Sequence, residues 1–232
     1  MTQDHQQPRK RLLYGRQQGH KLRARQQELL DTLLPQLAVE LPDAGPIDPQ
    51  SLFEFHPASI FLEIGFGGGE HLAARAGEHS ERGYLGAEPF VNGMAKILSA
   101  IETQKLTNIR LHHGDARELL ECLPDSSIAG VYLLYPDPWP KKRHNKRRFV
   151  NPENVRALHR VMKTGAEFLF ASDIPDYVRW TMTHVARHGG FAWTAERPGD
   201  WRDPPAGWPG TRYEAKAFRE GRRAHYLTFR KS

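Results

Sequence analysis

The clearest chemical signal in the sequence is a glycine cluster at residues 65–69, which directly follows an apolar run that contains Glu63. Glycine lets the backbone turn tightly and come close to a bound ligand. A dinucleotide fingerprint would need a third glycine at position 70, but this residue is Glu70, whose carboxylate would repel a pyrophosphate. The cluster therefore predicts a pocket for a ligand without a diphosphate.

Two more carboxylates follow the next two predicted strands. Glu88 directly follows the strand expected at 83–87, and Asp115 comes shortly after the strand expected at 108–112. The carboxyl ends of parallel strands meet at one edge of a sheet, so we expect these acids to lie close together. The set suits S-adenosylmethionine, which has no phosphate. Glu88 would lie near its ribose hydroxyls, Asp115 near its adenine amine and Glu63 near its methionine end. For each acid, the alternative is a helix N-cap or a solvated carboxylate.

A second signal is the turn at residues 135–140 (YPDPWP), whose three prolines fix φ and remove backbone donors. It presents Asp137 and Trp139 beside the predicted cofactor edge. An aromatic ring can stack on a nucleobase, which contributes about 1–3 kcal/mol, and a carboxylate can accept hydrogen bonds from a base. The basic run at 141–148 follows at once and predicts contacts with phosphates. A rigid structural turn is the alternative.

The net charge of +6 is concentrated in two segments. Seven Lys or Arg and one Asp lie in residues 1–25, and six Lys or Arg without an acid lie in residues 141–148. The rest of the 232-residue chain is net acidic, so the pattern predicts a localised polyanion site rather than a generally basic protein. For both runs, a solvated basic surface is the alternative.

Composition excludes several classes of protein. A single cysteine, Cys122, excludes an internal disulfide framework and a multi-cysteine zinc site, and the adjacent His112 and His113 would point to opposite faces of a strand. No stretch approaches the roughly 20 apolar residues of a membrane span, and the polar N-terminus has no apolar signal region. We expect a cytoplasmic protein without a metal or a membrane partner.

From residue 58 onward, short apolar runs alternate with amphipathic segments, which predicts a mainly parallel sheet. The expected strands are 59–64, 83–87, 108–112, 128–135 and 166–171, with a final antiparallel hairpin of 191–197 and 224–230 around a long loop at 198–221. The expected helices are 21–37, 69–77, 90–104, 152–163 and 175–188. Residues 1–20 are expected to be disordered or partly ordered.

Four further segments give a specific family resemblance: residues 136–148 (PDPWPKKRHNKRR), 171–173 (ASD), 211–214 (TRYE) and 14–19 (YGRQQG). Together they resemble the bacterial tRNA guanine-N7 methyltransferase family, and the glycine cluster with its acids resembles the motifs of class I methyltransferases. The resemblance implies an α/β, Rossmann-like class I methyltransferase fold. Its sheet would be seven-stranded and mainly parallel with an antiparallel C-terminal strand, and helices would cover both faces.

The resemblance also implies methyl transfer from S-adenosylmethionine to N7 of guanine 46 in the variable loop of tRNA. The expected cofactor-binding residues are Glu63, Gly65, Gly67, Glu88, Asp115 and Asp137, and Asp137 also matches the active-site position. The expected substrate-binding residues are Lys141, Asp173, Thr211, Arg212, Tyr213 and Glu214. The expected RNA-binding residues are Arg143, His144, Asn145, Lys146, Arg147 and Arg148.

We further expect a basic N-terminal extension at 1–50 with one helix, a catalytic domain at 51–232, and a monomer or homodimer. Asp173 and Glu214 would hydrogen-bond the guanine edge, or else cap a helix or order a loop. The competing functions are a methyltransferase with another target, such as an adenine amine or a protein, a non-catalytic RNA-binding protein on the same fold, and a nicotinamide dehydrogenase, against which Glu70 counts.

Overall fold

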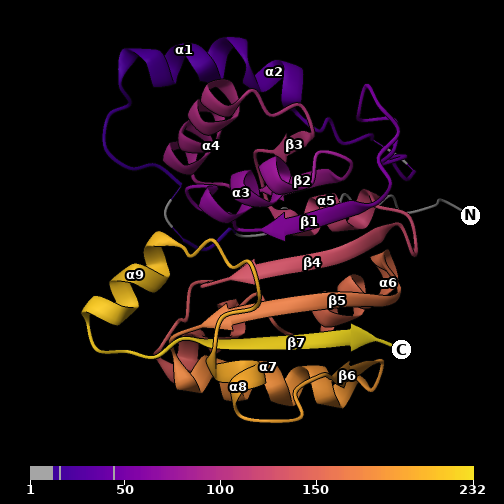
Figure 1. Ribbon diagram of the computed structural model, residues 1–232, viewed down its shortest axis with the longest axis vertical. Coiled ribbons are helices and arrows are strands. Elements are labelled where there is room, and N and C mark those ends of the chain that lie inside the picture. The colour runs from indigo at the N-terminus through magenta and orange to yellow at the C-terminus, as the bar shows by residue number, and fades with distance from the viewer. Residues whose placement is uncertain (1–12, 16, 44) are drawn as a thin grey trace, which may run out of the picture.

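The computed structural model describes residues 13–15, 17–43 and 45–232. Seven strands form one sheet in the order β3-β2-β1-β4-β5-β7-β6 (Figure 1). The strands are β1 (Ile60–Ile64), β2 (Gly83–Ala87), β3 (Ile109–His112), β4 (Ile128–Leu134), β5 (Met162–Ser172), β6 (Phe191–Trp193) and β7 (His225–Lys231). Strands β1 to β5 are parallel, whereas β7 runs antiparallel to β5 and β6. The predicted mainly parallel sheet with a C-terminal hairpin is confirmed.

The chain order reverses beside β1. Strands β2 and β3 lie on one side of it, and β4 and β5 lie on the other. In such a sheet, ligands bind in the crevice outside the carboxyl ends of the strands at the point of reversal. Figure 1 shows the arrowheads of β1, β4 and β5 pointing to the same side of the molecule.

Helices cover both faces of the sheet, as predicted, because side chains alternate along each strand. Ile60, Leu62 and Ile64 of β1 belong to one hydrophobic cluster with residues of α5, α6 and α7, whereas Phe61 packs against a second cluster with residues of α3 and α4. These helices are α3 (Glu70–Glu78), α4 (Val91–Gln104), α5 (Ala116–Cys122), α6 (Pro152–Val161) and α7 (Pro175–His188).

Two short helices replace the single helix predicted at 21–37. They are α1 (Ala24–Thr32) and α2 (Leu34–Leu37). The break at Leu33 precedes Pro35, which lacks a backbone N–H and disfavours continuation of the preceding helix. Leu29 and Leu37 are buried in the hydrophobic cluster that α4 shares. The predicted boundary at residue 50 stays a prediction.

In the part of the chain that the structure describes, neither edge of the sheet presents a long strand without a partner, as the bridge at one edge and the short strand at the other show. At the β3 edge, Ala38 forms a parallel bridge with Leu111, and Val39 N donates to Leu111 O at 2.8 Å. At the opposite edge, β6 has only three residues. Among the described residues, no helix has the length and apolar content needed to cross a bilayer.

The segment at 198–221, predicted as a long loop, contains helical turns. It contains α8 (Gly199–Arg202) and α9 (Arg212–Arg219). Its proline and glycine content concealed these helices, and α5 also went unpredicted because it has only seven residues. Residues 142–147 form a 3₁₀ helix, η1 (Lys142–Arg147).

Candidate active site

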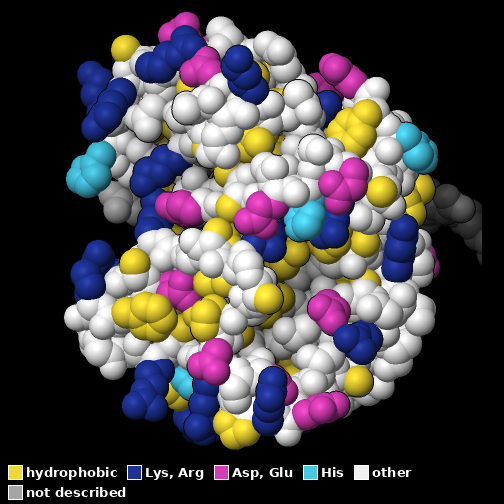
Figure 2. Space-filling view, in the orientation of Figure 1, with side chains coloured by type: hydrophobic (Ala, Val, Ile, Leu, Met, Phe, Trp, Pro, Cys, Tyr) yellow, Lys and Arg dark blue, Asp and Glu magenta, His cyan; other side chains and the backbone are white. Residues whose placement is uncertain are grey.

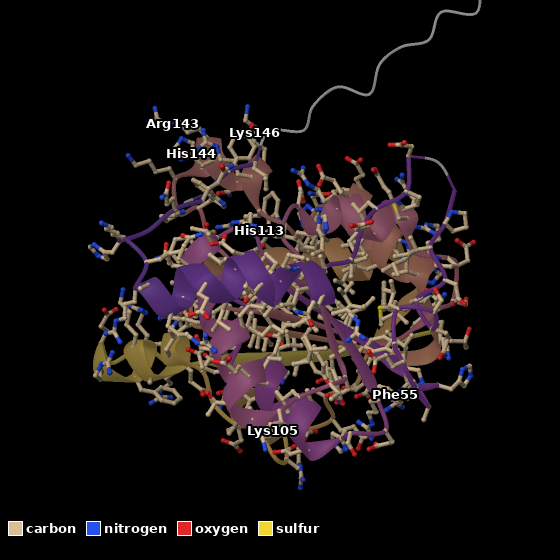
Figure 3. The ribbon with its side chains drawn as sticks, turned by 90° about the horizontal axis from the view of Figure 1, so that it is seen from above. Phe55, Lys105, His113, Arg143, His144 and Lys146 are labelled. Carbon is tan, nitrogen blue, oxygen red and sulfur yellow. The ribbon has the colours of Figure 1, made fainter. Side chains whose placement is uncertain are left out.

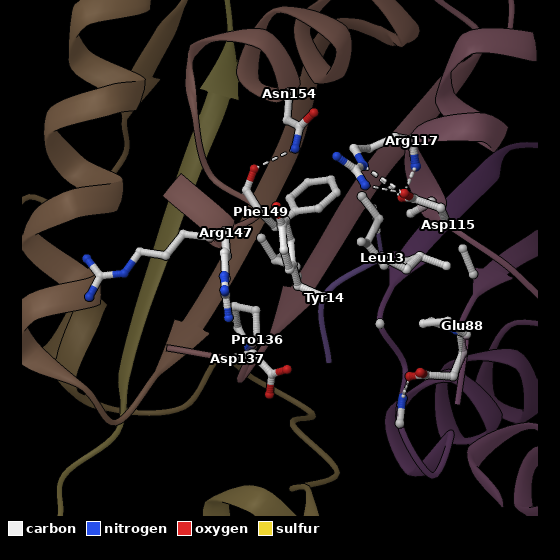
Figure 4. A pocket seen from close by; sticks show the side chains of 18 of the residues that line it. Leu13, Tyr14, Glu88, Asp115, Arg117, Pro136, Asp137, Arg147, Phe149 and Asn154 are labelled. Atoms are coloured by element: carbon white, nitrogen blue, oxygen red, sulfur yellow. Dashed lines mark hydrogen bonds and ion pairs between the residues drawn. The ribbon is translucent and has the colours of Figure 1, made fainter. Parts of the chain in front are cut away.

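A cavity of about 590 Å³ opens at the carboxyl ends of β1, β2 and β4 (Figure 4). Ligand sites for small molecules typically measure about 300–1,000 Å³, so the volume suits one organic ligand. The predicted site residues that line the cavity are Gly65, Gly67, Glu88, Asp115, Asp137, Lys146, Arg147, Arg148, Arg212 and Tyr213. The predicted site residues outside its lining are Glu63, Lys141, Arg143, His144, Asn145, Asp173, Thr211 and Glu214.

Glu88 binds the glycine cluster to the end of β2. Its carboxylate accepts hydrogen bonds from Gly67 N at 2.7 Å and from Phe90 N at 2.9 Å. Burial raises the pKa of Glu88, and these two N–H donors oppose the rise. A buried acid that already holds two backbone donors keeps further lone pairs for a ligand hydroxyl.

Gly67 and Gly93 let the two backbones of the site approach each other. Gly67 has φ +57°, in the left-handed region that glycine adopts easily. A Cβ at Gly93 in the first turn of α4 would lie 2.2 Å from Gly67 O. Gly93 was not predicted as a site residue, although a glycine inside an amphipathic helix was the signal that could have revealed it.

Asp115 has two roles in the structure. It is the N-cap of α5, because its side chain accepts a hydrogen bond from Arg117 N at 3.0 Å. The Arg117 guanidinium also donates to both of its oxygens, through Nε at 3.0 and 2.8 Å. The N-cap alternative is therefore correct for Asp115, and the same carboxylate also lines the cavity (Figure 4).

Glu63 lies on the other face of the sheet from the buried side chain of Ile64, because successive residues of β1 alternate. Its carboxylate is 3% exposed and lies 2.7 Å from Nδ1 of His71 on α3. The His71 ring also packs edge-on against Tyr132, with ring centroids 4.6 Å apart. In this structure Glu63 joins β1 to α3 and does not reach the cavity.

The proline turn after β4 brings Asp137 to the cavity in a strained backbone. Tyr135 and Trp139, on either side of it, have φ values of +50° and +44°, which are unusual for residues with a side chain. Tyr135 N donates to Ala171 O of β5 at 2.8 Å, which ties the start of the turn to the sheet. Burial raises the pKa of Asp137.

The basic run divides into exposed and packed side chains. Arg143, His144 and Lys146 lie at the outer end of the molecule in Figure 3. The Arg147 guanidinium lies over two aromatic rings, 4.9 Å from the centroid of Trp139 and 4.6 Å from that of Tyr14.

Figure 2 shows Lys and Arg side chains above and below a hollow on the left of the view, the side to which the parallel strands point. An anionic chain would meet cations on both sides of this hollow.

Arg148 differs from the rest of the run. Its side chain has no exposed surface and ion-pairs with Asp176 on α7 at 2.5 Å. The predicted RNA contact of Arg148 stays a prediction, and in this structure its guanidinium is buried against α7.

The TRYE segment begins α9 rather than lying in a loop. Thr211 is the N-cap and accepts a hydrogen bond from Glu214 N at 3.1 Å. Arg212 and Tyr213 in the first turn line the cavity, and Arg212 Nε lies 3.7 Å from Glu70 Oε1 at the start of α3. The segment thus brings one cation and one aromatic ring to the side of the glycine cluster.

Glu214 is buried among hydrogen-bond donors. It accepts from Trp208 Nε1 at 2.9 Å, from Tyr135 OH at 3.3 Å and from Tyr226 OH. The loop-ordering alternative for this residue fits these contacts, since they join α9 and the preceding loop to β7 and to the start of the proline turn. Asp173 likewise has an internal partner, with its carboxylate 2.5 Å from Nε of Arg222.

The N-terminal segment folds across the cavity. Leu13 and Tyr14 line it, and the ring of Tyr14 lies edge-on to Trp139 with centroids 6.2 Å apart. Gln17 O accepts from Val91 N at 3.0 Å, and Gly19 N donates to Asn92 Oδ1 at 2.6 Å, so residues 17–20 are ordered on α4. For residues 1–12 and 16, the predicted disorder lies outside the described residues.

Comparisons with known proteins agree with this site. A family model described as "Putative methyltransferase" matches residues 57–227. The tRNA (guanine-N(7)-)-methyltransferase of Agrobacterium fabrum is 53% identical over 229 residues, covering 99% of both chains. The proteins of the same name from Brucella melitensis biotype 1 and Bradyrhizobium diazoefficiens are 54% and 52% identical, covering 93% and 96% of this chain and 93% and 94% of their own.

A solved structure, the 16S rRNA methyltransferase KamB, shares the fold. Its TM-score is 0.53 at 18% sequence identity, and the match covers 76% of this chain and 89% of that chain. Within the described part of the chain, no group of three or more His, Cys, Asp or Glu is placed to hold a metal ion.

Proposed function

The chain belongs to the tRNA (guanine-N(7)-)-methyltransferase family, and from that premise we propose that it transfers the methyl group of S-adenosylmethionine to N7 of guanine 46 in the variable loop of tRNA. The observation that supports this most directly is the cavity itself. It joins a glycine cluster and buried acids to a proline turn with Asp137 and Trp139, beside exposed cations. With tRNA as its substrate, the protein would act in the cytoplasm.

The residues of the cavity fit S-adenosylmethionine. Gly65 has φ +67°, and a Cβ there would meet nothing within 4 Å, so the cluster leaves open space next to its backbone. Glu88 would accept from the ribose hydroxyls, and Asp115 would accept from the adenine amine, with acids also suiting the positive charge of the ligand. When bound, this molecule supplies a methyl group activated by its sulfonium.

The target atom needs no general base. Guanine N7 has an in-plane lone pair and no proton at neutral pH, so the protein has to position it rather than deprotonate it. Productive approach requires the reacting atoms to be about 3–3.5 Å apart and in line with the departing sulfur. Trp139 would provide a stacking surface for the purine, and the exposed cations of η1 would hold nearby phosphates.

Asp137 would stabilise the positive charge that develops on the purine as N7 gains the methyl group. Burial, which raises the pKa of this carboxyl, also lowers the local dielectric and strengthens its attraction to a cation. The carboxylate would also accept hydrogen bonds from the base, and it would take up no proton.

The function is tested by transfer of tritiated methyl to bulk tRNA, followed by cleavage chemistry specific for 7-methylguanine. Strand cleavage at position 46 is expected, and a transcript with adenine at this position should stay unlabelled. Asp137→Asn should lower kcat on the order of 100-fold while leaving the Kd for S-adenosylmethionine within a few-fold. Label on another atom, or equal turnover by Asp137→Asn, would contradict the proposal.

A further inference from the structure

Arg148 is a buried cation that lies between the proline turn and α7. Its Nε donates to the carbonyl oxygen of Pro138 at 2.8 Å, and its Nη2 lies 2.5 Å from Oδ2 of Asp176. The guanidinium also lies over the rings of Tyr177 and Trp180, 4.8 and 5.1 Å from their centroids. Two hydrogen bonds and two ring faces therefore fix its position.

The carbonyl group that Arg148 binds belongs to Pro138, the residue between Asp137 and Trp139. The prolines fix φ at three positions of the turn, but they have no N–H to donate, so the turn can form few backbone hydrogen bonds of its own. Its backbone is also strained, with positive φ at Tyr135 and Trp139. Such a conformation persists only where surrounding groups hold it, and Arg148 supplies a donor to its centre.

On its other side, Arg148 is fixed to a well-packed helix. Trp180 Nε1 donates to Val150 O at 2.6 Å, and Val150 N donates to Tyr177 OH at 3.3 Å. The segment that follows Arg148 is thus hydrogen-bonded to the same face of α7 that holds the guanidinium. A shift of the turn would have to break contacts with a helix whose Tyr177 is fully buried.

A contribution to the stability of the folded state does not by itself explain why an arginine is buried here. Burying a guanidinium costs desolvation energy, and an apolar side chain of similar length often serves a core equally well. Nη1 of Arg148 is buried and has no hydrogen-bond partner among the described residues, whereas Asp176 is 57% exposed. Removing Arg148 would therefore leave the Asp176 charge in water rather than stranded in the interior.

We propose that Arg148 is a positioning residue, which holds the turn so that Asp137 and Trp139 face the purine. This proposal rests on the proposed function, because the geometry it preserves is that of the methyl transfer. It would act through the Pro138 carbonyl rather than through a side-chain contact with substrate or donor, because its side chain has no exposed surface. Its loss should thus affect the rate of transfer more than the binding of either ligand.

The test compares Arg148→Met and Arg148→Lys with Arg143→Gln, which removes an exposed cation from the same basic run. Both Arg148 variants should lower kcat by about tenfold or more, since misplacement by about 1 Å can cost 100-fold, with KM for tRNA and Kd for S-adenosylmethionine within about twofold. Arg143→Gln should instead raise KM for tRNA and leave kcat near the wild-type value. Unchanged kcat in the Arg148 variants, or a rise in KM alone, would overturn the proposal.

A second measurement does not depend on activity. The protein labelled with 5-fluorotryptophan has five fluorine signals, and that of Trp139 is assigned by its loss in Trp139→Phe. In Arg148→Met the Trp139 signal should shift or broaden while thermal unfolding and S-adenosylmethionine binding remain close to wild type. If Arg148→Met does not fold, Asp176→Asn, which removes only the exposed partner, should give a smaller shift in the same direction. An unmoved Trp139 signal would refute the positioning role, whereas failure of the wild-type protein to methylate tRNA would refute only the function.

Discussion

Replacing Gly93 by alanine should displace the glycine cluster and weaken binding of S-adenosylmethionine, although alanine is the better helix former. The added Cβ would lie 2.2 Å from the carbonyl oxygen of Gly67 and 3.3 Å from Cγ of Glu88. Real Cβ atoms essentially never approach a neighbour within 3.0 Å. Because the neighbour is backbone, the loop has to retreat by about 1 Å from a closely packed site.

The size of the effect follows from these contacts. Overpacking costs about 1–3 kcal/mol, and alanine returns about 1 kcal/mol of helix propensity, so the free energy of unfolding should fall by at most about 2 kcal/mol. Binding should suffer in addition, because moving Gly67 disturbs its 2.7 Å hydrogen bond to Glu88. A charge-assisted hydrogen bond contributes about 1.5–3 kcal/mol, so the Kd for S-adenosylmethionine should rise about 10- to 100-fold.

Titration calorimetry measures the Kd, and thermal unfolding measures the stability. Gly77→Ala in α3 is the matched control, because its Cβ would meet only side-chain atoms of Leu106 and Gln104, at 3.8 and 3.9 Å. That variant should be more stable by up to about 1 kcal/mol, with unchanged affinity. If Gly93→Ala bound S-adenosylmethionine as tightly as the wild-type protein, our account of the close approach would be wrong.

Other variants test the remaining parts of the site. Replacing the four exposed cations of residues 141–146 by glutamine should raise KM for tRNA. The slope of the logarithm of tRNA affinity against the logarithm of salt concentration should become shallower by about 0.9 for each lost phosphate contact. An unchanged slope would mean that this surface does not bind RNA. Glu214→Ala should lower the free energy of unfolding by about 2 kcal/mol or more, because it leaves buried donors unpaired, and Glu214→Gln should restore part of it; a loss below about 0.5 kcal/mol would argue against the buried network. Burial raises the pKa of both Glu88 and Asp137. Between the ordinary and the raised pKa, the folded state binds more protons than the unfolded chain. These two groups therefore make stability fall as pH rises through that range. Asp137→Asn should therefore remove part of that fall in thermal unfolding measured against pH, and an identical slope in the two proteins would contradict the raised pKa.

Local patterns were enough to predict the sheet and its pocket. Apolar runs of strand length bounded by turn residues predicted the five parallel strands, and the acids at strand ends predicted the edge at which the cavity lies. The division of α1 from α2 and the helices α5, α8 and α9 were missed. They are short or surrounded by proline and glycine, so their periodicity is weak and tertiary contacts decide their form.

Side-chain direction was the harder part of the site. Glu63 sits one residue before Ile64, and the alternation of β1 sends it to His71 on α3. Arg148 ends a run of cations, yet it is buried under α7, because charge alone does not reveal which member of a run packs inward. Gly93 depends on a contact between segments more than 20 residues apart, which no local pattern encodes.

The covered margins of the sheet limit how copies of this protein can associate. An exposed strand with free N–H and C=O groups can recruit a strand from another molecule, but here Ala38 and Val39 already pair with Leu111, and the opposite margin is three residues long. A continuous intermolecular sheet is thereby disfavoured. A homodimer of this chain is therefore expected to form through helices or loops, and the protein should resist the strand-to-strand aggregation that exposed margins promote.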